Sequence, residues 1–239
     1  MIATFTALIL AHVLADFVLQ TYAMVKHKRG PRVMALHTAI VLLTAQATTG
    51  QIAAPELLLL AAAHLIIDCI KIYGGFRSFS AFLVDQIAHV ATITVIASFA
   101  PTLWSTGAWA AQPWLLPAMA LFTGFIVTLT AGQHAIALLM RPYAMRIRNN
   151  GLRDGGHQIG LLERGLIFLF ILKNLPVPTG FLITAKSVLR FGTASRDQRT
   201  AEYVIIGTLA SFGWALLAAL ATQAALVHLP PLEIAPPAP

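Results

Sequence analysis

Long apolar segments, separated by short polar ones, occupy almost the whole chain. Most are close to the length of about 20 residues that a helix needs to cross a bilayer. The seventh is shorter, and Lys186 and Arg190 interrupt it. The segments lie at 2–25, 33–50, 55–73, 78–100, 114–140, 158–175, 179–191 and 203–227. This pattern predicts an all-α, polytopic transmembrane helix bundle with seven or eight spans.

The connections between these segments are short, so no separate soluble domain is expected. We predict a single membrane domain over residues 1–239. It comprises a four-helix part at 1–100, C-terminal helices at 114–227 and a proline-rich, disordered tail at 228–239.

The composition agrees with a membrane protein. Hydrophobic residues make up 58% of the 239 positions, charged residues make up 10%, and the mean hydropathy is +0.77. A soluble domain carries roughly 25% charged residues, which excludes an ordinary water-soluble fold. The net charge of +7 comes from bases in short loops, and we therefore expect no nucleic-acid partner.

The basic residues lie in alternate loops, which predicts the topology. The loops near 51–54 and 101–113 contain no lysine or arginine. Because cytoplasmic loops carry an excess of lysine and arginine, the basic loops are expected in the cytoplasm and the N-terminus in the periplasm. The bases that carry this argument are Lys26, Lys28, Arg29, Arg32, Lys71, Arg77, Arg141, Arg146, Arg148, Arg153, Arg190, Arg196 and Arg199.

Histidines and aspartates recur inside the first four apolar segments. Residues four apart lie on one face of a helix, so each histidine–aspartate pair at this spacing presents an imidazole beside a carboxylate. The polar positions are His12, Asp16 and Gln20 in the first segment, His37 in the second, His64, Asp68 and Lys71 in the third, and Asp85, Gln86 and His89 in the fourth.

The energetic cost of these residues argues against chance. An aspartate at the centre of a membrane helix costs about 2.5–3.5 kcal/mol, and three would cost roughly 8–10 kcal/mol if left unpaired in lipid. At a rise of 1.5 Å per residue, the polar positions lie about 5–20 Å from the basic loops. We therefore expect one shared site inside the bundle, in its cytoplasmic half.

Imidazole and carboxylate ligands suit a divalent cation such as zinc, manganese or iron. We predict a metal site, with the aspartates also acting as catalytic groups and Gln20, Lys71 and Gln86 contacting substrate. The predicted ligands are His12, Asp16, His37, His64, Asp68, Asp85 and His89. A metal-free proton or substrate relay and purely structural polar packing remain open as alternatives.

Lys186 and Arg190 are four apart and share a helix face, so they are candidates for an anionic substrate group. Pairing with Glu163 or Glu202 is an equally good interpretation of these two bases.

The motifs beginning at His12, His64 and Asp85 resemble a bacterial inner-membrane family of unknown function. The motifs are His12-Val-Leu-Ala-Asp16-Phe-Val-Leu-Gln20, His64-Leu-Ile-Ile-Asp68-Cys-Ile-Lys71 and Asp85-Gln86-Ile-Ala-His89. The family is typified by a His-Leu-Leu-Ala-Asp-Phe-x-Leu-Gln start. More distantly, the pairs are similar to those of membrane-bound metal-dependent hydrolases.

These resemblances imply a multi-pass protein of the bacterial inner membrane. Together with the polar cluster, they favour a metal-dependent hydrolase of a lipid-linked or phosphate ester, with a membrane lipid or lipid-linked substrate. A proton-coupled transporter or ion pathway is the alternative, because intramembrane aspartates and histidines also form proton relays.

Overall fold

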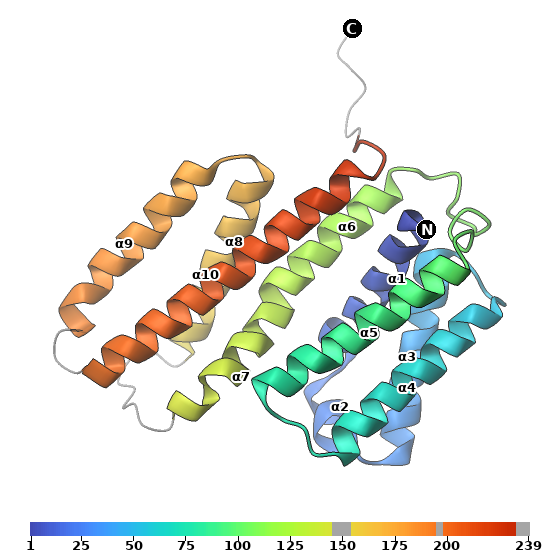
Figure 1. The fold of residues 1–239 in the computed structure, drawn as a ribbon, viewed down its shortest axis with the longest axis horizontal. Coiled ribbons are helices and arrows are strands. Elements are labelled where there is room, and N and C mark those ends of the chain that lie inside the picture. The colour runs from blue at the N-terminus through green and yellow to red at the C-terminus, as the bar shows by residue number, and fades with distance from the viewer. Residues whose placement is uncertain (145–153, 195–197, 233–239) are drawn as a thin grey trace, which may run out of the picture. The chain divides into compact units, whose positions relative to one another are not determined.

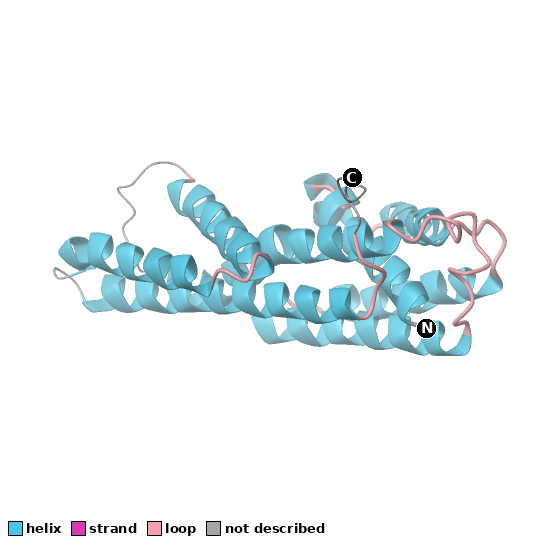
Figure 2. Cartoon of the chain, turned by 90° about the horizontal axis from the view of Figure 1, so that it is seen from above, coloured by secondary structure: helices cyan, strands magenta, loops and turns pink. Residues whose placement is uncertain are grey.

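The computed structural model describes residues 1–144, 154–194 and 198–232, without the side chains of residues 187 and 189–194. All regular elements in these ranges are helices, and no strand is present among them (Figures 1 and 2). The prediction of an all-α fold is therefore confirmed. Arg146, Arg148, Arg153 and Arg196, and residues 233–239 of the predicted tail, lie outside the described residues.

The N-terminal helices follow the predicted segments, with one difference. The first predicted segment, 2–25, is not a continuous helix, because the backbone becomes extended at Gln20 and Thr21. The Thr21 hydroxyl then caps a new helix by accepting a hydrogen bond from the Met24 amide. The elements are α1 (Ile2–Leu14), the π-helical turn η1 (Ala15–Leu19), α2 (Tyr22–His27), α3 (Pro31–Thr49), α4 (Pro55–Tyr73) and α5 (Phe79–Phe99).

The remaining helices include one that is longer than predicted. The short segment 179–191 is part of a 19-residue helix that begins at Pro176, where proline suits the first helical turn. The elements are α6 (Leu115–Ile126), the π-helical turn η2 (Val127–Ala131), α7 (Gly132–Ala144), α8 (Gly155–Leu172), α9 (Pro176–Ala194) and α10 (Gln198–Val227). The described residues form two compact units, one within 1–123 and 225–232 and the other within 124–224.

In the first unit, α1, α3, α4 and α5 form a closed four-helix bundle (Figure 1). Helix α1 contacts α3 and α5, and α4 contacts the same two helices. One half of the bundle has an apolar core that includes Leu8, Leu57 and Ile93. The other half, near the α2–α3 and α4–α5 connections, contains the histidines and aspartates. The bundle therefore has an apolar and a polar half along its axis.

The outer surface of this bundle is apolar, whereas polar side chains lie inside it. On α4, Leu59, Ile66 and Ile70 are exposed while His64 and Asp68 are buried. A soluble bundle shows the reverse arrangement. An apolar exterior around buried charges is the arrangement that a lipid environment favours.

Five of the described helical segments are long and apolar enough to cross a membrane. They are Ile2–Leu19, Phe79–Phe99, Leu115–Ala144, Gly155–Leu172 and Gln198–Val227. Helices α3 and α4 are not among them, although each has 19 residues. Helix α3 is less apolar, with polar residues such as His37, and α4 carries three charged residues, Glu56, Asp68 and Lys71, of which the last two belong to the interior cluster.

The second unit is organised around Arg164, whose exposed fraction is 2%. Its guanidinium donates hydrogen bonds to the carbonyl oxygens of Thr128 (3.1 Å) and Leu129 (3.3 Å), and to the side chains of Gln133 (2.8 Å) and Ser211 (3.1 Å). Both carbonyls belong to η2, where the π-helical hydrogen-bond pattern differs from that of an α-helix. Arg164 therefore links α8 to η2, α7 and α10.

Gly124 on α6 provides a test of packing in this unit. An added Cβ would lie 2.0 Å from Thr222 Oγ1 and 3.0 Å from the Phe168 ring. The Thr222 hydroxyl is itself held by the Ala218 carbonyl at 2.8 Å. We expect Gly124→Ala to destabilise the protein by about 1–3 kcal/mol through overpacking, measured by thermal unfolding in detergent.

Gly213 on α10 is the matched control, because an added Cβ there would meet nothing within 4 Å. Gly213→Ala is expected to leave stability unchanged or raise it by about 0.5–1 kcal/mol. Equal effects of the two substitutions would contradict the packing described for Gly124.

Candidate metal centre

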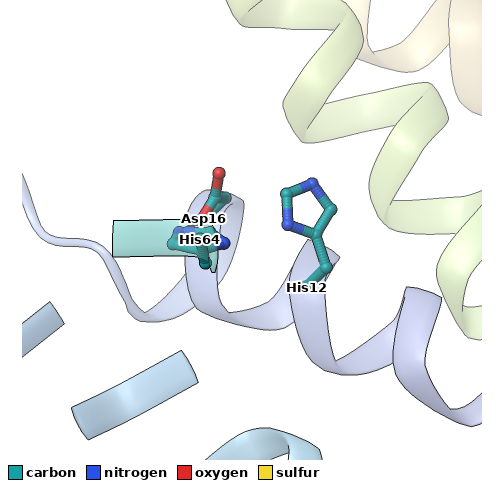
Figure 3. A group of neighbouring side chains, drawn as sticks. All are labelled: His12, Asp16 and His64. Carbon is teal, nitrogen blue, oxygen red and sulfur yellow. Dashed lines mark ion pairs between the residues drawn. The ribbon is translucent and has the colours of Figure 1, made fainter. Parts of the chain in front are cut away.

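The structure gathers all seven predicted ligands inside the first unit. Six are buried, and the Asp16 side chain is 10% exposed. His12 and Asp16 come from α1 and η1, and His64 comes from α4 (Figure 3). His37 lies on α3, and Asp85 and His89 lie on α5. Four helices therefore contribute to one polar interior.

Four of these residues form a close group, which we call the quartet: Asp16, His37, His64 and Asp68. The two Nε2 atoms of His37 and His64 lie 3.2 Å apart. Asp16 Oδ1 lies 3.3 Å from the first of these nitrogens and 3.4 Å from the second. Asp68 Oδ2 lies 3.3 Å and 3.5 Å from the same two atoms. Four potential ligand atoms therefore converge, with five separations between 3.2 and 3.5 Å.

The separations among His37, His64 and Asp68 are close to the edges of a tetrahedral metal site. Zinc binds histidine nitrogen and carboxylate oxygen at about 2.0–2.2 Å, which gives tetrahedron edges of about 3.3–3.6 Å. Three overlapping groups in this region have ligand atoms within 4.8 Å of one another. They are His12, Asp16 and His64; His37, His64 and Asp68; and Asp68, Asp85 and His89. The geometry of these buried groups can hold a metal ion.

Hydrogen bonds alone do not account for the quartet. Its two Nε2 atoms carry at most one proton each, so they cannot bridge all five close contacts. Asp16 Oδ1 is buried and accepts no hydrogen bond from the described residues, and Asp68 Oδ2 is contacted by the Lys28 ammonium group at 2.7 Å. A single cation bound by His37, His64 and Asp68 would contact three of these atoms at once.

Charge also favours a cation. If the histidines are neutral, the net charge of the site is −1. It contains three carboxylates, of Asp16, Asp68 and Asp85, and two ammonium groups, of Lys28 and Lys71. An uncompensated charge is costly in a low-dielectric interior. One divalent cation would convert the balance to one positive charge, which an anionic ligand can neutralise.

Lys28 is a member of the site that the sequence analysis did not identify. Its Nζ atom lies 2.7 Å from Asp68 Oδ2, and its side chain is 7% exposed. In the sequence it is one of several bases in a loop, where it served only as a topology signal. The break between η1 and α2 brings this loop to the end of the bundle. The spacing of residues in the sequence does not predict that turn.

The three residues of the N-terminal bundle predicted as substrate contacts make contacts with site residues. They are Lys71, Gln20 and Gln86. Lys71 pairs with Asp85 at 2.5 Å, not with Asp68 three residues before it. The Gln20 amide nitrogen lies 3.1 Å from both ring nitrogens of His37. Gln86 connects two ligands, because it accepts from His12 Nε2 at 3.2 Å and donates to Asp85 Oδ2 at 3.1 Å. Such contacts orient metal ligands in known sites.

Asp16 lies in the π-helical turn η1. Single π-helical turns inside α-helices are frequent at functional sites. The Gln20 backbone leaves the helix immediately afterwards. This turn places Asp16 toward His37 and His64, while His12 on the preceding turn lies beside His89, with ring centroids 4.9 Å apart.

A small cavity adjoins the imidazoles of His12, His64 and His89. Its other walls are mainly apolar and include Leu8 and Ile93. It has room for about one water molecule. The site therefore has space for a small ligand beside the histidines.

A basic hollow lies on the surface of the loop that contains Lys28. We use this name for the concave surface lined by Lys26, His27, Arg29, Gly30, Pro31, Arg32 and Val33. Its bases are exposed. No ion pair of Lys26, Arg29 or Arg32 occurs among the residues that the structure describes. The sequence analysis did not propose these bases as a binding surface.

The two bases predicted for an anionic substrate group lie on α9 in the second unit. Lys186 forms an ion pair with Glu163, the partner that the sequence analysis named as an alternative. The Arg190 side chain lies outside the described residues. Lys186 is therefore held by a carboxylate of its own unit.

The chain was compared with known protein families, curated proteins and solved structures. Residues 4–116 match the profile of a family described as "protein of unknown function (DUF3307)". This range contains the quartet, Lys28, Asp85 and His89. No curated protein and no solved structure shows significant similarity to the chain. The match supports similarity to an uncharacterised family and assigns no activity.

Proposed function

We propose that this chain is a metal-dependent integral-membrane enzyme that hydrolyses a lipid-linked or phosphate ester. The observation that supports this proposal most strongly is the quartet, in which two imidazole nitrogens and two carboxylate oxygens approach to 3.2–3.5 Å. A divalent zinc, manganese or iron ion bound in this polar interior would act as a Lewis acid toward water and toward a phosphoryl or carbonyl oxygen.

The proposed location is the bacterial inner membrane, with seven or eight spans and a periplasmic N-terminus. Five helical segments meet the length and hydropathy of spans. We add α3 and α4, because they complete the bundle with α1 and α5 and carry apolar outer faces, for example Leu36 and Leu43 on α3. The basic loops then lie on the cytoplasmic side.

The substrate proposed is anionic and enters from the basic hollow. Its exposed bases suit a phosphate or an anionic lipid head group. Lys28 belongs to the same loop, and its ammonium group reaches Asp68 in the quartet. In the reaction, a water oxygen bonds to phosphorus or to the ester carbonyl carbon, the ester bond breaks, and the leaving oxygen receives the water proton.

Metal removal tests the proposed activity. Purified full-length protein in detergent should hydrolyse dioleoyl phosphatidic acid or bis-p-nitrophenyl phosphate when it is loaded with zinc, manganese or ferrous iron. We expect dialysis against a chelator to reduce the rate at least 100-fold and metal to restore it, because the water nucleophile would lose its activation. Product is measured as released phosphate or nitrophenol.

The matched control is His157→Ala, which replaces an exposed histidine of the second unit and should leave the rate unchanged. A metal-loaded protein that hydrolyses neither these esters nor a panel of lipid phosphates would count against the hydrolase proposal.

The second candidate is a proton-coupled transporter. The buried pair Lys28–Asp68 and the partly buried pair Lys71–Asp85 support it, because intramembrane acid–base pairs also form proton relays. Flux into proteoliposomes that needs a proton gradient, persists without metal and is lost in Asp68→Asn would favour this function over hydrolysis.

A further inference from the structure

We propose that the bundle holds a second divalent cation, bound by Asp68, Asp85 and His89, beside the one in the quartet. This inference rests on the proposed function, which it deepens from a mononuclear to a dinuclear site. One ligand atom from each of these three residues lies within 4.8 Å of the other two. Asp68 also belongs to the quartet, so its carboxylate would bridge the two ions.

The histidine of this second group has its proton position fixed by the backbone. His89 Nδ1 donates to the Asp85 carbonyl oxygen at 2.8 Å. Because a neutral imidazole carries one N–H, Nε2 has a free lone pair. That atom is buried and has no hydrogen-bond partner among the described residues. Metal-binding histidines characteristically donate their other ring nitrogen to a carbonyl or carboxylate in this way.

The two carboxylate oxygens of Asp85 have different surroundings. Its Oδ2 atom accepts from Lys71 at 2.5 Å and from Gln86 at 3.1 Å. Its Oδ1 atom is buried without a hydrogen-bond partner in the described part of the chain. One oxygen is therefore oriented by neighbours while the other remains available for a cation.

His12 has the complementary arrangement. Gln86 donates through its Nε2 to Asp85, so its oxygen is the atom that faces His12 and accepts from His12 Nε2. His12 Nδ1 then carries a lone pair, and it too is buried without a partner in the described residues. His12 and His89 stack with ring centroids 4.9 Å apart, and both line the one-water cavity.

The number of ligands distinguishes the two positions. The quartet offers up to four protein ligands, which is the number found in closed, structural zinc sites. The second position has three ligands, as catalytic zinc sites do, and so keeps one place for water. The cavity lined by His89 provides the space for that water, and His12 Nδ1 can accept its hydrogen bond. The second ion is therefore the one that would activate water.

Two divalent ions also specify the substrate class. With two divalent ions, three carboxylates and two lysines, the net charge of the site is +3. A bound hydroxide and a doubly negative phosphate monoester would neutralise this charge. Two-metal sites with ions about 3.5–4 Å apart are common in phosphate-ester hydrolysis. We therefore favour a phosphate monoester of a lipid over a carboxylic ester.

Metal stoichiometry of the purified full-length protein tests this inference. With zinc, we expect two ions per chain in the wild type and in His157→Ala, and one ion in His89→Ala. One ion in both the wild type and His89→Ala would overturn the second position. The lone pairs of His12 and His89 would then share a water molecule.

Electron paramagnetic resonance of the manganese-loaded wild type gives a second measurement that does not depend on a variant folding. Two carboxylate-bridged manganese(II) ions should give an exchange-coupled spectrum, and an isolated six-line spectrum at full occupancy would refute the pair. If the protein binds a single ion and its hydrolysis is sensitive to a chelator, this inference is wrong and the proposed function is unaffected. No bound ion at all would contradict both.

Discussion

Replacing Asp68 by asparagine should weaken metal binding at least about 100-fold and abolish ester hydrolysis. Asp68 Oδ2 lies 3.3 and 3.5 Å from the two quartet nitrogens. Even substitutions of residues that only orient metal ligands typically cost 10–100-fold in affinity, so loss of a charged ligand should cost more. Metal content by elemental analysis and affinity by competition with a chelating dye check this expectation.

The substitution also leaves the Lys28 ammonium buried without its partner, which by itself can destabilise the bundle. The double variant Lys28→Met, Asp68→Asn removes both charges of this pair and should keep the protein folded while it still lacks the metal. Glu56→Gln, at the opposite end of α4, is the control and should bind metal normally. Wild-type metal affinity in the double variant would show that Asp68 is a structural ion-pair residue and not a ligand.

Replacing Arg164 by methionine should be the most damaging single change to the second unit. It removes four hydrogen bonds and leaves the η2 carbonyls of Thr128 and Leu129 without their donor. Breaking a buried charged network typically costs 3–5 kcal/mol. We expect a lower temperature of unfolding and a smaller monodisperse fraction in size-exclusion chromatography.

Arg164→Lys keeps the charge but cannot reproduce the planar, multidentate geometry of the guanidinium, so it should be intermediate. Arg141→Met on α7 replaces an exposed arginine and serves as the control. If Arg164→Met melts at the wild-type temperature, the network does not hold η2, α8 and α10 together.

Much of the fold could be predicted from the hydrophobic pattern, because lipid-facing helices need long apolar segments. The predicted boundaries 55–73 and 78–100 differ little from α4 (Pro55–Tyr73) and α5 (Phe79–Phe99). The break at Gln20 was not predicted. It depends on a π-helical turn and a Thr21 cap inside an otherwise apolar segment, and neither changes the hydropathy of that segment.

The membership of the candidate site could be predicted better than its internal arrangement. Spacing by four residues places His64 and Asp68 on one face. The cost of exposing these polar groups to lipid favours a position of that face inside the bundle. Which site residues pair with one another depends on how the four helices pack. The spacing of residues on one helix does not specify that packing. For this reason Lys28 was overlooked, and Lys71 pairs with Asp85 on the neighbouring helix.

X-ray absorption at the metal edge of the zinc-loaded, full-length protein is the most direct test of the quartet as a metal site. We expect stoichiometric zinc with nitrogen and oxygen ligands only, at about 2.0–2.2 Å, and the multiple-scattering signature of imidazole. The single cysteine, Cys69, follows Asp68 in the chain. A sulfur ligand at about 2.3 Å, or protein that retains no zinc, would contradict it.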